Sequence, residues 1–301
     1  MPDADAKPTN LVRVALLDRF QPAIEAALEA ALPDGWVLAK METPEYPDRA
    51  AAIRAADVAF VMGGAMPAAV IQAGGRLRFI QKLGAGVDNI DLEAARAAGV
   101  AVAKLAAGNA IPVAEHTLML MLACCRRLIT VDRQTRAGEW VKEDGRARNK
   151  HLHGKRVGII GLGAIGRALA NLLTGFGVDV VFSDPVQPPP ALARQLAVTP
   201  VDLETLIATS DVVTLHCPLT AETAGLLSAE RIAAMKPGAL LINCARGGLV
   251  DEAALSAALA EGRLFAAGLD VFATEPPGLH PLFATEAAIV TSHLAGATLD
   301  N

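Results

Sequence analysis

A glycine-rich segment that directly follows a run of strand-forming residues constrains the fold of this chain most. Residues 155–160 are rich in Val and Ile, and Gly161-Leu162-Gly163-Ala164-Ile165-Gly166 then leads into a helical pattern. Gly161 permits a tight turn, Gly163 lets backbone N–H groups approach a pyrophosphate, and Gly166 lets the helix pack closely on the strand. The helix N-terminus adds partial positive charge. The sequence therefore predicts a strand–turn–helix unit that binds a dinucleotide.

An acidic residue stands where such a unit needs one. Asp184 ends the next predicted strand, over residues 178–183, about 20 residues after the glycines. Its carboxylate can accept hydrogen bonds from ribose hydroxyls and repels a 2′-phosphate. Because no arginine directly follows Asp184, the sequence predicts NAD rather than NADP.

Length and composition favour a two-domain protein that acts on small molecules. A chain of 301 residues exceeds the size at which one core usually stops growing. Its hydrophobic content is 52%, but the longest apolar run, 118–125, stops at Arg126-Arg127, short of the ~18 residues that a membrane span requires. The net charge of −5 and scattered Lys and Arg leave no basic footprint for nucleic acid. We expect neither a membrane nor a nucleic acid partner.

The cysteines, the histidines and the N-terminus bear on compartment and metal content. Cys124, Cys125, Cys217 and Cys244 show no paired-ligand spacing, which indicates reduced thiols. Residues 1–7 lack the layout of a secretory signal, so we expect a cytoplasmic protein. His151 and His153 have no acidic or cysteine partner at ligand spacing, and no metal site is predicted.

Strand and helix patterns alternate along the chain. The first hundred residues predict strands at 11–17, 57–61, 78–83 and 100–103 and helices at 23–32, 67–73 and 92–98, the last capped by Asp91. A long helix is expected over 111–128. Further strands are expected near 155–160, 178–182, 211–215, 239–243, 265–269 and 287–291, with helices that start near Ala164, Asp202, Ser228 and Asp251. This alternation predicts an α/β protein with doubly wound parallel sheets and ligands at the carboxyl ends of the strands.

Seven sequence blocks, read together, carry a resemblance that is more specific than any one motif. They are residues 84–91, 113–116, 161–166, 216–220, 243–251, 268–276 and 293–298. In this order they resemble the D-2-hydroxyacid dehydrogenase family from about residue 80 onward. The first eighty residues match only in general pattern.

The resemblance implies an architecture and a set of partners. Two Rossmann-like domains are expected: a smaller flavodoxin-like substrate domain made of residues 1–107 plus 294–301, and an NAD-binding domain, 108–293, inserted into it. The resemblance also implies a small 2-oxo or 2-hydroxy acid substrate and a homodimer held largely by the cofactor domains. Members usually continue for another helix beyond the position of Asn301, so we expect that helix to be truncated or missing.

Three side chains suit the reduction of a 2-oxo acid. Arg246 has the planar fork that pairs bidentately with a carboxylate. His293 can give and take a proton near neutral pH, and the carboxylate of Glu275 would stabilise its imidazolium form. By resemblance, Arg246, Glu275 and His293 take the catalytic places of the family.

The resemblance also assigns binding residues. Backbone N–H groups of Gly84, Ala85 and Gly86 are expected to form an anion nest for the substrate carboxylate, together with Arg246. His116, beside Glu115, is expected to make a structural hydrogen bond, and the cysteines are expected to be small apolar wall residues. The expected cofactor-binding residues are Gly161, Gly163, Ala164, Ile165, Gly166, Asp184, His216, Cys217, Pro218, Thr223, Cys244, Ala245, Arg246, Asp270, His293 and Gly296.

Alternatives within and beyond this reaction remain open. The similar formate dehydrogenases carry glutamine as the partner of the histidine, so Glu275 favours alcohol–carbonyl interconversion. Phosphoglycerate dehydrogenases usually carry a basic residue in the loop that here reads Val61-Met62-Gly63-Gly64-Ala65-Met66. Its absence favours a small acid such as glyoxylate, hydroxypyruvate or lactate, although Lys82 or Arg76 could compensate in a 3-phosphoglycerate dehydrogenase. A nonenzymatic NAD-sensing protein, similar to the C-terminal-binding corepressors, is a further alternative.

Overall fold

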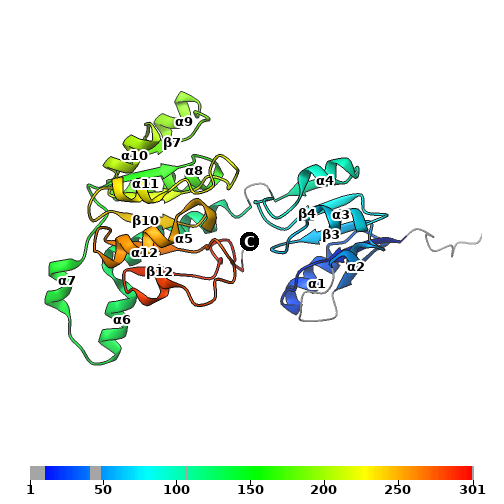
Figure 1. Ribbon diagram of the computed structural model, residues 1–301, viewed down its shortest axis with the longest axis horizontal. Coiled ribbons are helices and arrows are strands. Elements are labelled where there is room, and N and C mark those ends of the chain that lie inside the picture. The colour runs from blue at the N-terminus through cyan, green and yellow to red at the C-terminus, as the bar shows by residue number, and fades with distance from the viewer. Residues whose placement is uncertain (1–10, 41–48, 106–107, 300–301) are drawn as a thin grey trace, which may run out of the picture. The chain divides into compact units, whose positions relative to one another are not determined.

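The computed structural model describes residues 11–40, 49–105 and 108–299. Contacts divide the chain into two compact units, Met1–Ala106 and Ala107–Asn301 (Figure 1). Each unit contains one sheet, and the strands pair in parallel throughout both sheets. The prediction of an α/β protein with two parallel sheets is confirmed.

The first unit is a five-stranded sheet with the strand order β2-β1-β3-β4-β5. This 2-1-3-4-5 order is the flavodoxin-like form of the doubly wound fold, as expected. The strands are β1 (Val12–Leu16), β2 (Trp36–Lys40), β3 (Val58–Val61), β4 (Phe79–Lys82) and β5 (Ala101–Lys104). The helices are α1 (Pro22–Ala30), α2 (Arg49–Ile53), α3 (Ala68–Ala73) and α4 (Leu92–Ala97).

The seven-stranded sheet of the second unit has the order β12-β11-β10-β9-β6-β7-β8. Counted within the unit, this is the Rossmann order 3-2-1-4-5-6 with one further strand, and the order reverses between β6 and β9, where such folds bind ligands. The strands are β6 (Arg156–Ile160), β7 (Asp179–Ser183), β8 (Val198–Pro200), β9 (Val212–Leu215), β10 (Leu240–Asn243), β11 (Ala266–Leu269) and β12 (Ala288–Val290).

Helix starts in the second unit follow their capping residues. Asp202, Ser228 and Asp251 accept hydrogen bonds from N–H groups in the first turns of α10, α11 and α12, as the sequence predicts. The helices are α5 (Ala110–Arg126), α6 (Leu128–Arg136), α7 (Lys142–Arg148), α8 (Ala164–Leu173), α9 (Pro190–Gln195), α10 (Leu203–Thr209), α11 (Ala229–Ala234) and α12 (Glu252–Ala260), with 3-10 turns η1 (Thr174–Phe176), η2 (Gly247–Leu249) and η3 (Pro281–Ala284).

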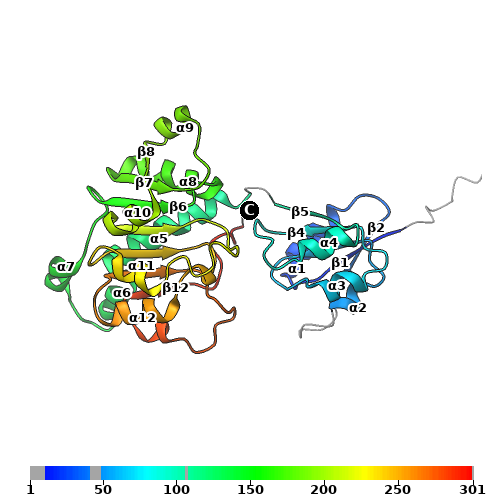
Figure 2. The same cartoon turned by 45° about the horizontal axis from the view of Figure 1, so that its top comes forward.

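The long helix expected over 111–128 is shorter than predicted. It ends at Arg126, because Arg127 adopts a left-handed conformation with φ 49° and starts a new helix, α6. Helix α7 follows and stands off from the sheet in both views (Figure 1, Figure 2). No helix in the described ranges is long and apolar enough to cross a membrane.

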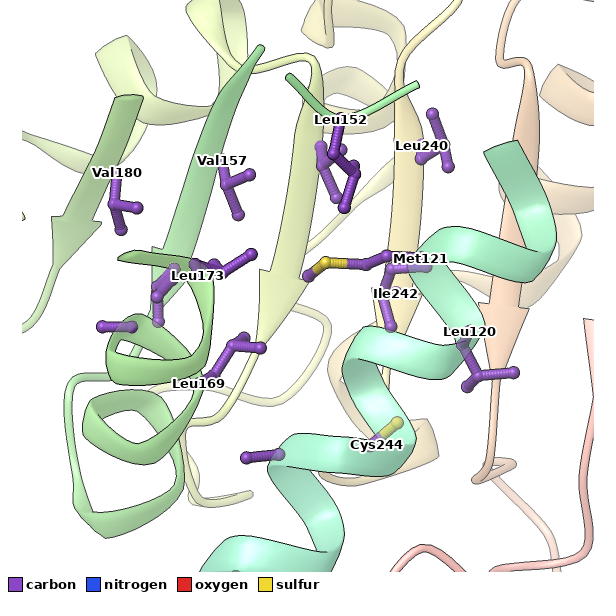
Figure 3. Close-up of a cluster of buried hydrophobic side chains, with 14 of the residues drawn as sticks. Leu120, Met121, Leu152, Val157, Leu169, Leu173, Val180, Leu240, Ile242 and Cys244 are labelled. Atoms are coloured by element: carbon purple, nitrogen blue, oxygen red, sulfur yellow. The ribbon is translucent and has the colours of Figure 1, made fainter. Parts of the chain in front are cut away.

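Helices α5 and α8 cover one face of the seven-stranded sheet. Met121 of α5 and Leu169 and Leu173 of α8 lie in one buried cluster with strand residues such as Val157 (Figure 3). Leu120 of α5 packs against Gly268 of β11. On the other face, residues of α10 and α12 form a second buried cluster. Each buried Leu, Ile or Phe contributes about 1.5–3 kcal/mol, so both faces hold the strand ends rigidly in place.

The last described residues group with the second unit. The N–H groups of Leu294 and Ala295 donate to the carboxylate of Asp270, at 3.0 and 2.8 Å. The assignment of residues 294–301 to the substrate domain, and the boundary at residue 107, stay predictions.

Candidate active site

The predicted cofactor and catalytic residues of the second unit lie in the loops that leave the carboxyl ends of its strands. Gly161 follows β6, Asp184 follows β7, His216 follows β9, Arg246 follows β10 and Asp270 follows β11. Parallel strands present these ends at one edge of the sheet. The fold therefore brings residues that are far apart in the sequence, from Gly161 to Asp270, to a common edge.

The glycine loop has the geometry that a pyrophosphate requires. Gly161 has φ +95°, and a Cβ there would lie 2.7 Å from the backbone nitrogen of Cys217; a Cβ on Gly166 would lie 2.3 Å from the carbonyl oxygen of Gly161. A Cβ on Gly163 would meet nothing within 4 Å. Gly163 is the N-cap of α8 and no side chain caps this helix, so open space lies at a helix N-terminus whose first turn contains Ala164 and Ile165.

Asp184 is held against this loop. Its Oδ2 accepts from the N–H of Leu162 at 2.7 Å and its Oδ1 accepts from the N–H of Val186 at 2.7 Å. A carboxylate has about four acceptor sites, so both oxygens keep capacity for ribose hydroxyls. The N–H of Leu162 was not among the predicted contacts, and it fixes the carboxylate beside the glycines.

His216 backs the glycine loop as a neutral side chain. Its Nε2 lies 3.0 Å from the hydroxyl of Thr214, and burial lowers its pKa to about 4. Part of the residue is accessible to solvent, but the ring atom Nδ1 is buried without a hydrogen-bond partner among the described residues. The imidazole is therefore uncharged at neutral pH, which suits a wall position.

The neighbouring cysteines have the properties of wall residues too. Burial raises the pKa of Cys217 to about 11 and that of Cys244 to about 12, so both thiols stay protonated and are poor nucleophiles. All four cysteines are free. Their expected role as small apolar residues is consistent with this environment.

The hydroxyl of Thr223 stabilises the loop after β9. Thr223 donates to the carbonyl of Pro218 at 2.6 Å and accepts from the N–H of Thr220 at 2.8 Å. On the next strand end, Ala245 donates its N–H to the side chain of Asn243 at 3.0 Å. These hydrogen bonds fix the conformation of the two loops. The loops contain three residues that were expected to bind the cofactor: Thr223, Pro218 and Ala245.

His293 and Glu275 form a short hydrogen bond between their side chains. His293 Nδ1 and Glu275 Oε2 are 2.6 Å apart, while Glu275 Oε1 accepts from the N–H of Phe272 at 3.0 Å. Burial opposes ionisation of Glu275, but the bonds from His293 and Phe272 and the charge of Arg246 outweigh it and lower the pKa of Glu275. Because Nδ1 is engaged, Nε2 is the ring atom available to a substrate.

Arg246 lies on the loop beside this pair. Asn243 Nδ2 donates to the carbonyl of Arg246 at 2.9 Å, and the guanidinium Nη1 donates to the carbonyl of Ala245 at 2.7 Å. A Cβ on Gly247 would lie 1.8 Å from the carbonyl carbon of Phe272. The loop that carries Arg246 is therefore in direct contact with the loop that carries Glu275.

Asp270 supports the loop of His293 from below. It is fully buried, its carboxylate accepts from the hydroxyl of Thr291 at 2.5 Å, and its carbonyl accepts from the N–H of His293 at 2.8 Å. Thr291 was not predicted as a site residue. Gly296, one residue beyond Ala295, packs against Asn109 at the start of α5.

The predicted anion nest belongs to the first unit. Gly84, Ala85 and Gly86 follow the carboxyl end of β4, and their N–H groups have no acceptor within residues 11–40, 49–105 and 108–299. This loop can offer donors to an anion, and its role with the substrate stays a prediction.

Residues 118–295 match the family described as D-isomer specific 2-hydroxyacid dehydrogenase, NAD binding domain. That match covers more than half of the chain. The chain belongs to the D-isomer specific 2-hydroxyacid dehydrogenases. The second unit is accordingly the NAD-binding domain of this family, and the recognised resemblance is confirmed.

Individual members of the family are similar over much of the chain. A D-3-phosphoglycerate dehydrogenase of Mycobacterium bovis is 39% identical over 292 residues, which are 97% of this chain and 54% of that protein. A hydroxypyruvate reductase of Thermotoga maritima is 38% identical over 234 residues, 77% of this chain and 74% of that protein. The chain thus spans about half the length of the phosphoglycerate dehydrogenases that it matches.

A solved structure agrees with the fold. The NAD-dependent formate dehydrogenase from Staphylococcus aureus in complex with NAD has a TM-score of 0.84 at 28% identity, with 96% of this chain and 90% of that chain covered.

Proposed function

We propose that this chain is an NAD-dependent D-2-hydroxyacid dehydrogenase that interconverts a small 2-oxo acid and its D-2-hydroxy acid. The observation that carries the proposal is the 2.6 Å pair of His293 and Glu275 at the carboxyl edge of an NAD-binding sheet. An imidazole with a carboxylate partner can protonate a carbonyl oxygen and later recover the proton. Glu275, rather than a neutral amide, favours this proton transfer over formate oxidation.

Each catalytic side chain has one task in this reaction. Arg246 binds the substrate carboxylate with its planar fork and polarises the adjacent carbonyl. His293 Nε2 donates the proton to the carbonyl oxygen in reduction and removes it in oxidation, while Glu275 stabilises the imidazolium. The nicotinamide supplies or accepts the hydride. Gly84, Ala85 and Gly86 add backbone donors to the substrate carboxylate.

Cofactor choice follows from the ribose end of the site. Asp184, held at the glycine loop by Leu162 and Val186, supports NAD over NADP because its charge repels a 2′-phosphate. We assign residues 108–293 to this cofactor domain and residues 1–107 plus 294–301 to the substrate domain. Free cysteines support a cytoplasmic location, where thiols stay reduced.

The substrate is proposed to be unphosphorylated. In the loop after β3, the N–H groups of Met62 and Gly64 donate to Asp18 at 2.6 and 3.0 Å, and Arg49 pairs with the same carboxylate at 3.0 Å. Lys82 Nζ donates to the carbonyl of Met62 and, at 2.9 Å, to Asn89. The cations around this loop already serve internal bonds.

Arg76 is also engaged in an ion pair within the first unit. It forms an ion pair with Asp57 at 3.0 Å, and Asp57 precedes β3, so this pair lies at the amino edge of the sheet, opposite the ligand edge. These bonds support glyoxylate, hydroxypyruvate or lactate over a phosphate ester. The name of the 39% identical relative favours the alternative, 3-phosphoglycerate dehydrogenase.

A substrate panel tests the proposal. Purified protein is assayed for NADH oxidation with glyoxylate, hydroxypyruvate, pyruvate and 3-phosphohydroxypyruvate, and for NAD reduction with both lactate enantiomers. We expect turnover of a small 2-oxo acid and of D-lactate rather than L-lactate. A kcat/KM that is highest for 3-phosphohydroxypyruvate would establish the alternative. NADH binding without any turnover would instead favour a nonenzymatic NAD-sensing protein.

A homodimer held by the cofactor domains is the proposed assembly. Large apolar side chains are exposed along α6 and the segment after it: Leu128 at 51%, Ile129 at 60% and Trp140 at 84%. Aromatic residues are enriched at the cores of interfaces. A second copy of this chain is the proposed partner for this surface.

A further inference from the structure

The acid/base residue has an unfavourable backbone conformation. His293 has φ +54°, in the left-handed region that costs side-chain-bearing residues of order 1 kcal/mol or more. Such a residue keeps its conformation only where its surroundings fix it. Hydrogen bonds to Asp270 fix the loop from Thr291 to Ala295.

Asp270 supplies most of the bonds. Its two carboxylate oxygens accept from the N–H groups of Leu294 and Ala295 and from the hydroxyl of Thr291, and its carbonyl accepts from the N–H of His293. The side chain is fully buried. A buried carboxylate requires hydrogen-bond donors for its oxygens.

His116 completes this arrangement. Its Nε2 lies 3.1 Å from the hydroxyl oxygen of Thr291 and 3.6 Å from Oδ1 of Asp270. In the described part of the chain, Thr291 and His116 are the side chains within hydrogen-bond or ion-pair distance of the Asp270 carboxylate. The side chain of His116 is only 12% exposed, so water competes little for these contacts.

The donor and acceptor of each of these hydrogen bonds can be assigned. Thr291 donates its single hydroxyl proton to Asp270, so its oxygen can only accept from His116, and Nε2 must carry a hydrogen. The sequence of bonds is therefore Nε2–H of His116, the hydroxyl of Thr291, and Oδ1 of Asp270. It links α5, the first helix of the second unit, to the loop of His293.

We propose that His116 is a positioning residue for His293, acting through the hydroxyl of Thr291 and the carboxylate of Asp270. It touches neither substrate nor cofactor in this role, which rests on the proposed dehydrogenase function. Loss of the Nε2 donor lets the Thr291 hydroxyl turn and loosens the left-handed loop. The imidazole of His293 then spends less time in line with the substrate carbonyl.

Steady-state kinetics of matched variants test the proposal. His116→Leu and Thr291→Val remove the donor chain with little change of volume. Each is expected to lower kcat with the best 2-oxo acid by about 10- to 100-fold, as small misplacements of catalytic groups do, while the KM for NADH changes less than about threefold. His151→Leu, at an exposed histidine, is the control and should match wild type.

Conservative variants separate positioning from packing. His116→Gln places an amide nitrogen near the position of Nε2, and Thr291→Ser keeps the hydroxyl, so both should regain most of kcat. The double variant His116→Leu/Thr291→Val should be no worse than Thr291→Val alone, because the residues act in one chain. Should His116→Leu not fold, His116→Asn replaces it: its shorter amide cannot reach Thr291, and its kcat should fall well below that of His116→Gln.

Several results would overturn the inference. They are wild-type kcat in His116→Leu, equal kcat in His116→Gln and His116→Asn, and losses that multiply in the double variant. If the wild-type enzyme is active and the His116 and Thr291 variants have the same kcat, only the positioning role of His116 is refuted. A wild-type protein that reduces no 2-oxo acid refutes the proposed function itself.

Discussion

At the scale of single residues, the pair of His293 and Glu275 is where chemistry and structure meet most directly. The sequence predicts that an acidic partner accompanies the histidine, and the two side chains are 2.6 Å apart. Although burial opposes this shift, the pKa of Glu275 is lowered, mainly by the hydrogen bond from His293. The carboxylate of Glu275 therefore stays ionised down to acidic pH.

Replacement of Glu275 by Gln tests the pair. The amide keeps the shape but removes the charge that stabilises the imidazolium, so the proton donor is lost at lower pH. We expect the high-pH fall of the reductive rate to move to lower pH by about one unit, as seen in profiles of kcat/KM for the 2-oxo acid. Glu261→Gln, at the exposed end of α12, is the control. Superimposable profiles of Glu275→Gln and wild type would contradict the pairing.

A second prediction at this scale concerns Asp184, which we propose sets the preference for NAD over NADP. Asp184→Ser combined with Val186→Arg removes the charge that repels a 2′-phosphate and adds one that attracts it. The ratio of kcat/KM for NADPH to that for NADH should rise by about 100-fold, roughly 2.7 kcal/mol. Val186→Arg alone is the matched control and should shift the ratio much less. Unchanged selectivity in the double variant would remove Asp184 from the ribose site.

The sequence predicts site residues whose chemistry is intrinsic, but not the groups whose role depends on a neighbour. Glycine, arginine and histidine at strand ends carry their own signal. Thr291 and the N–H of Leu162 do not, since a hydroxyl or an amide becomes informative only when its acceptor, Asp270 or Asp184, is known to lie beside it. Placement of Asp270 beneath His293 likewise required the fold.

At the scale of elements, prediction succeeded where pattern and capping agree. The starts of α10, α11 and α12 were correct because their capping residues also accept the expected bonds. Strands β2 and β8 were missed: each lies at a sheet edge, and each buries a single residue, Leu38 or Val198, so neither sequence alternates between apolar and polar residues. The break at Arg127 was missed because no glycine or proline marks it.

The contact of α8 with the glycine loop yields an element-scale prediction. Gly166→Ala would place a Cβ 2.3 Å from the carbonyl oxygen of Gly161, and backbone must move to relieve it. The gain in helix propensity, about 1 kcal/mol, is offset by overpacking of about 1–3 kcal/mol, and the start of the helix shifts. We expect the Kd for NADH, measured by fluorescence titration, to rise at least about tenfold.

Gly175, where an added Cβ would meet no other atom, provides the control for Gly166→Ala. A Cβ on Gly175 would meet nothing within 4 Å, so Gly175→Ala should bind NADH as wild type does. Equal NADH affinity in the Gly166 and Gly175 variants would show that close packing of α8 is dispensable.

At the scale of the whole molecule, the chain consists of two parallel-sheet units of the expected classes. The resemblance supplied the flavodoxin-like and Rossmann orders, whereas composition alone supported only two domains. The proposed homodimer rests on exposed residues, and the sequence does not distinguish the apolar residues exposed on α6 from core residues.

The proposed dimer is tested by charging its surface. Ile129→Asp combined with Trp140→Ser should convert a dimer of about twice the 31.2 kDa chain mass to a monomer, because a buried unpaired charge destabilises an interface. Light scattering after size-exclusion chromatography measures the mass. Leu92→Ser, on the first unit and 48% exposed, should leave it unchanged. A wild-type monomer would contradict the assembly.

The left-handed backbone of His293 has a consequence for the evolution of this protein. Glycine adopts φ +54° without a steric cost, so under the proposed function His293→Gly would gain stability and lose the proton donor. With His293 as the proposed acid/base residue, activity and stability would place opposite demands on this position.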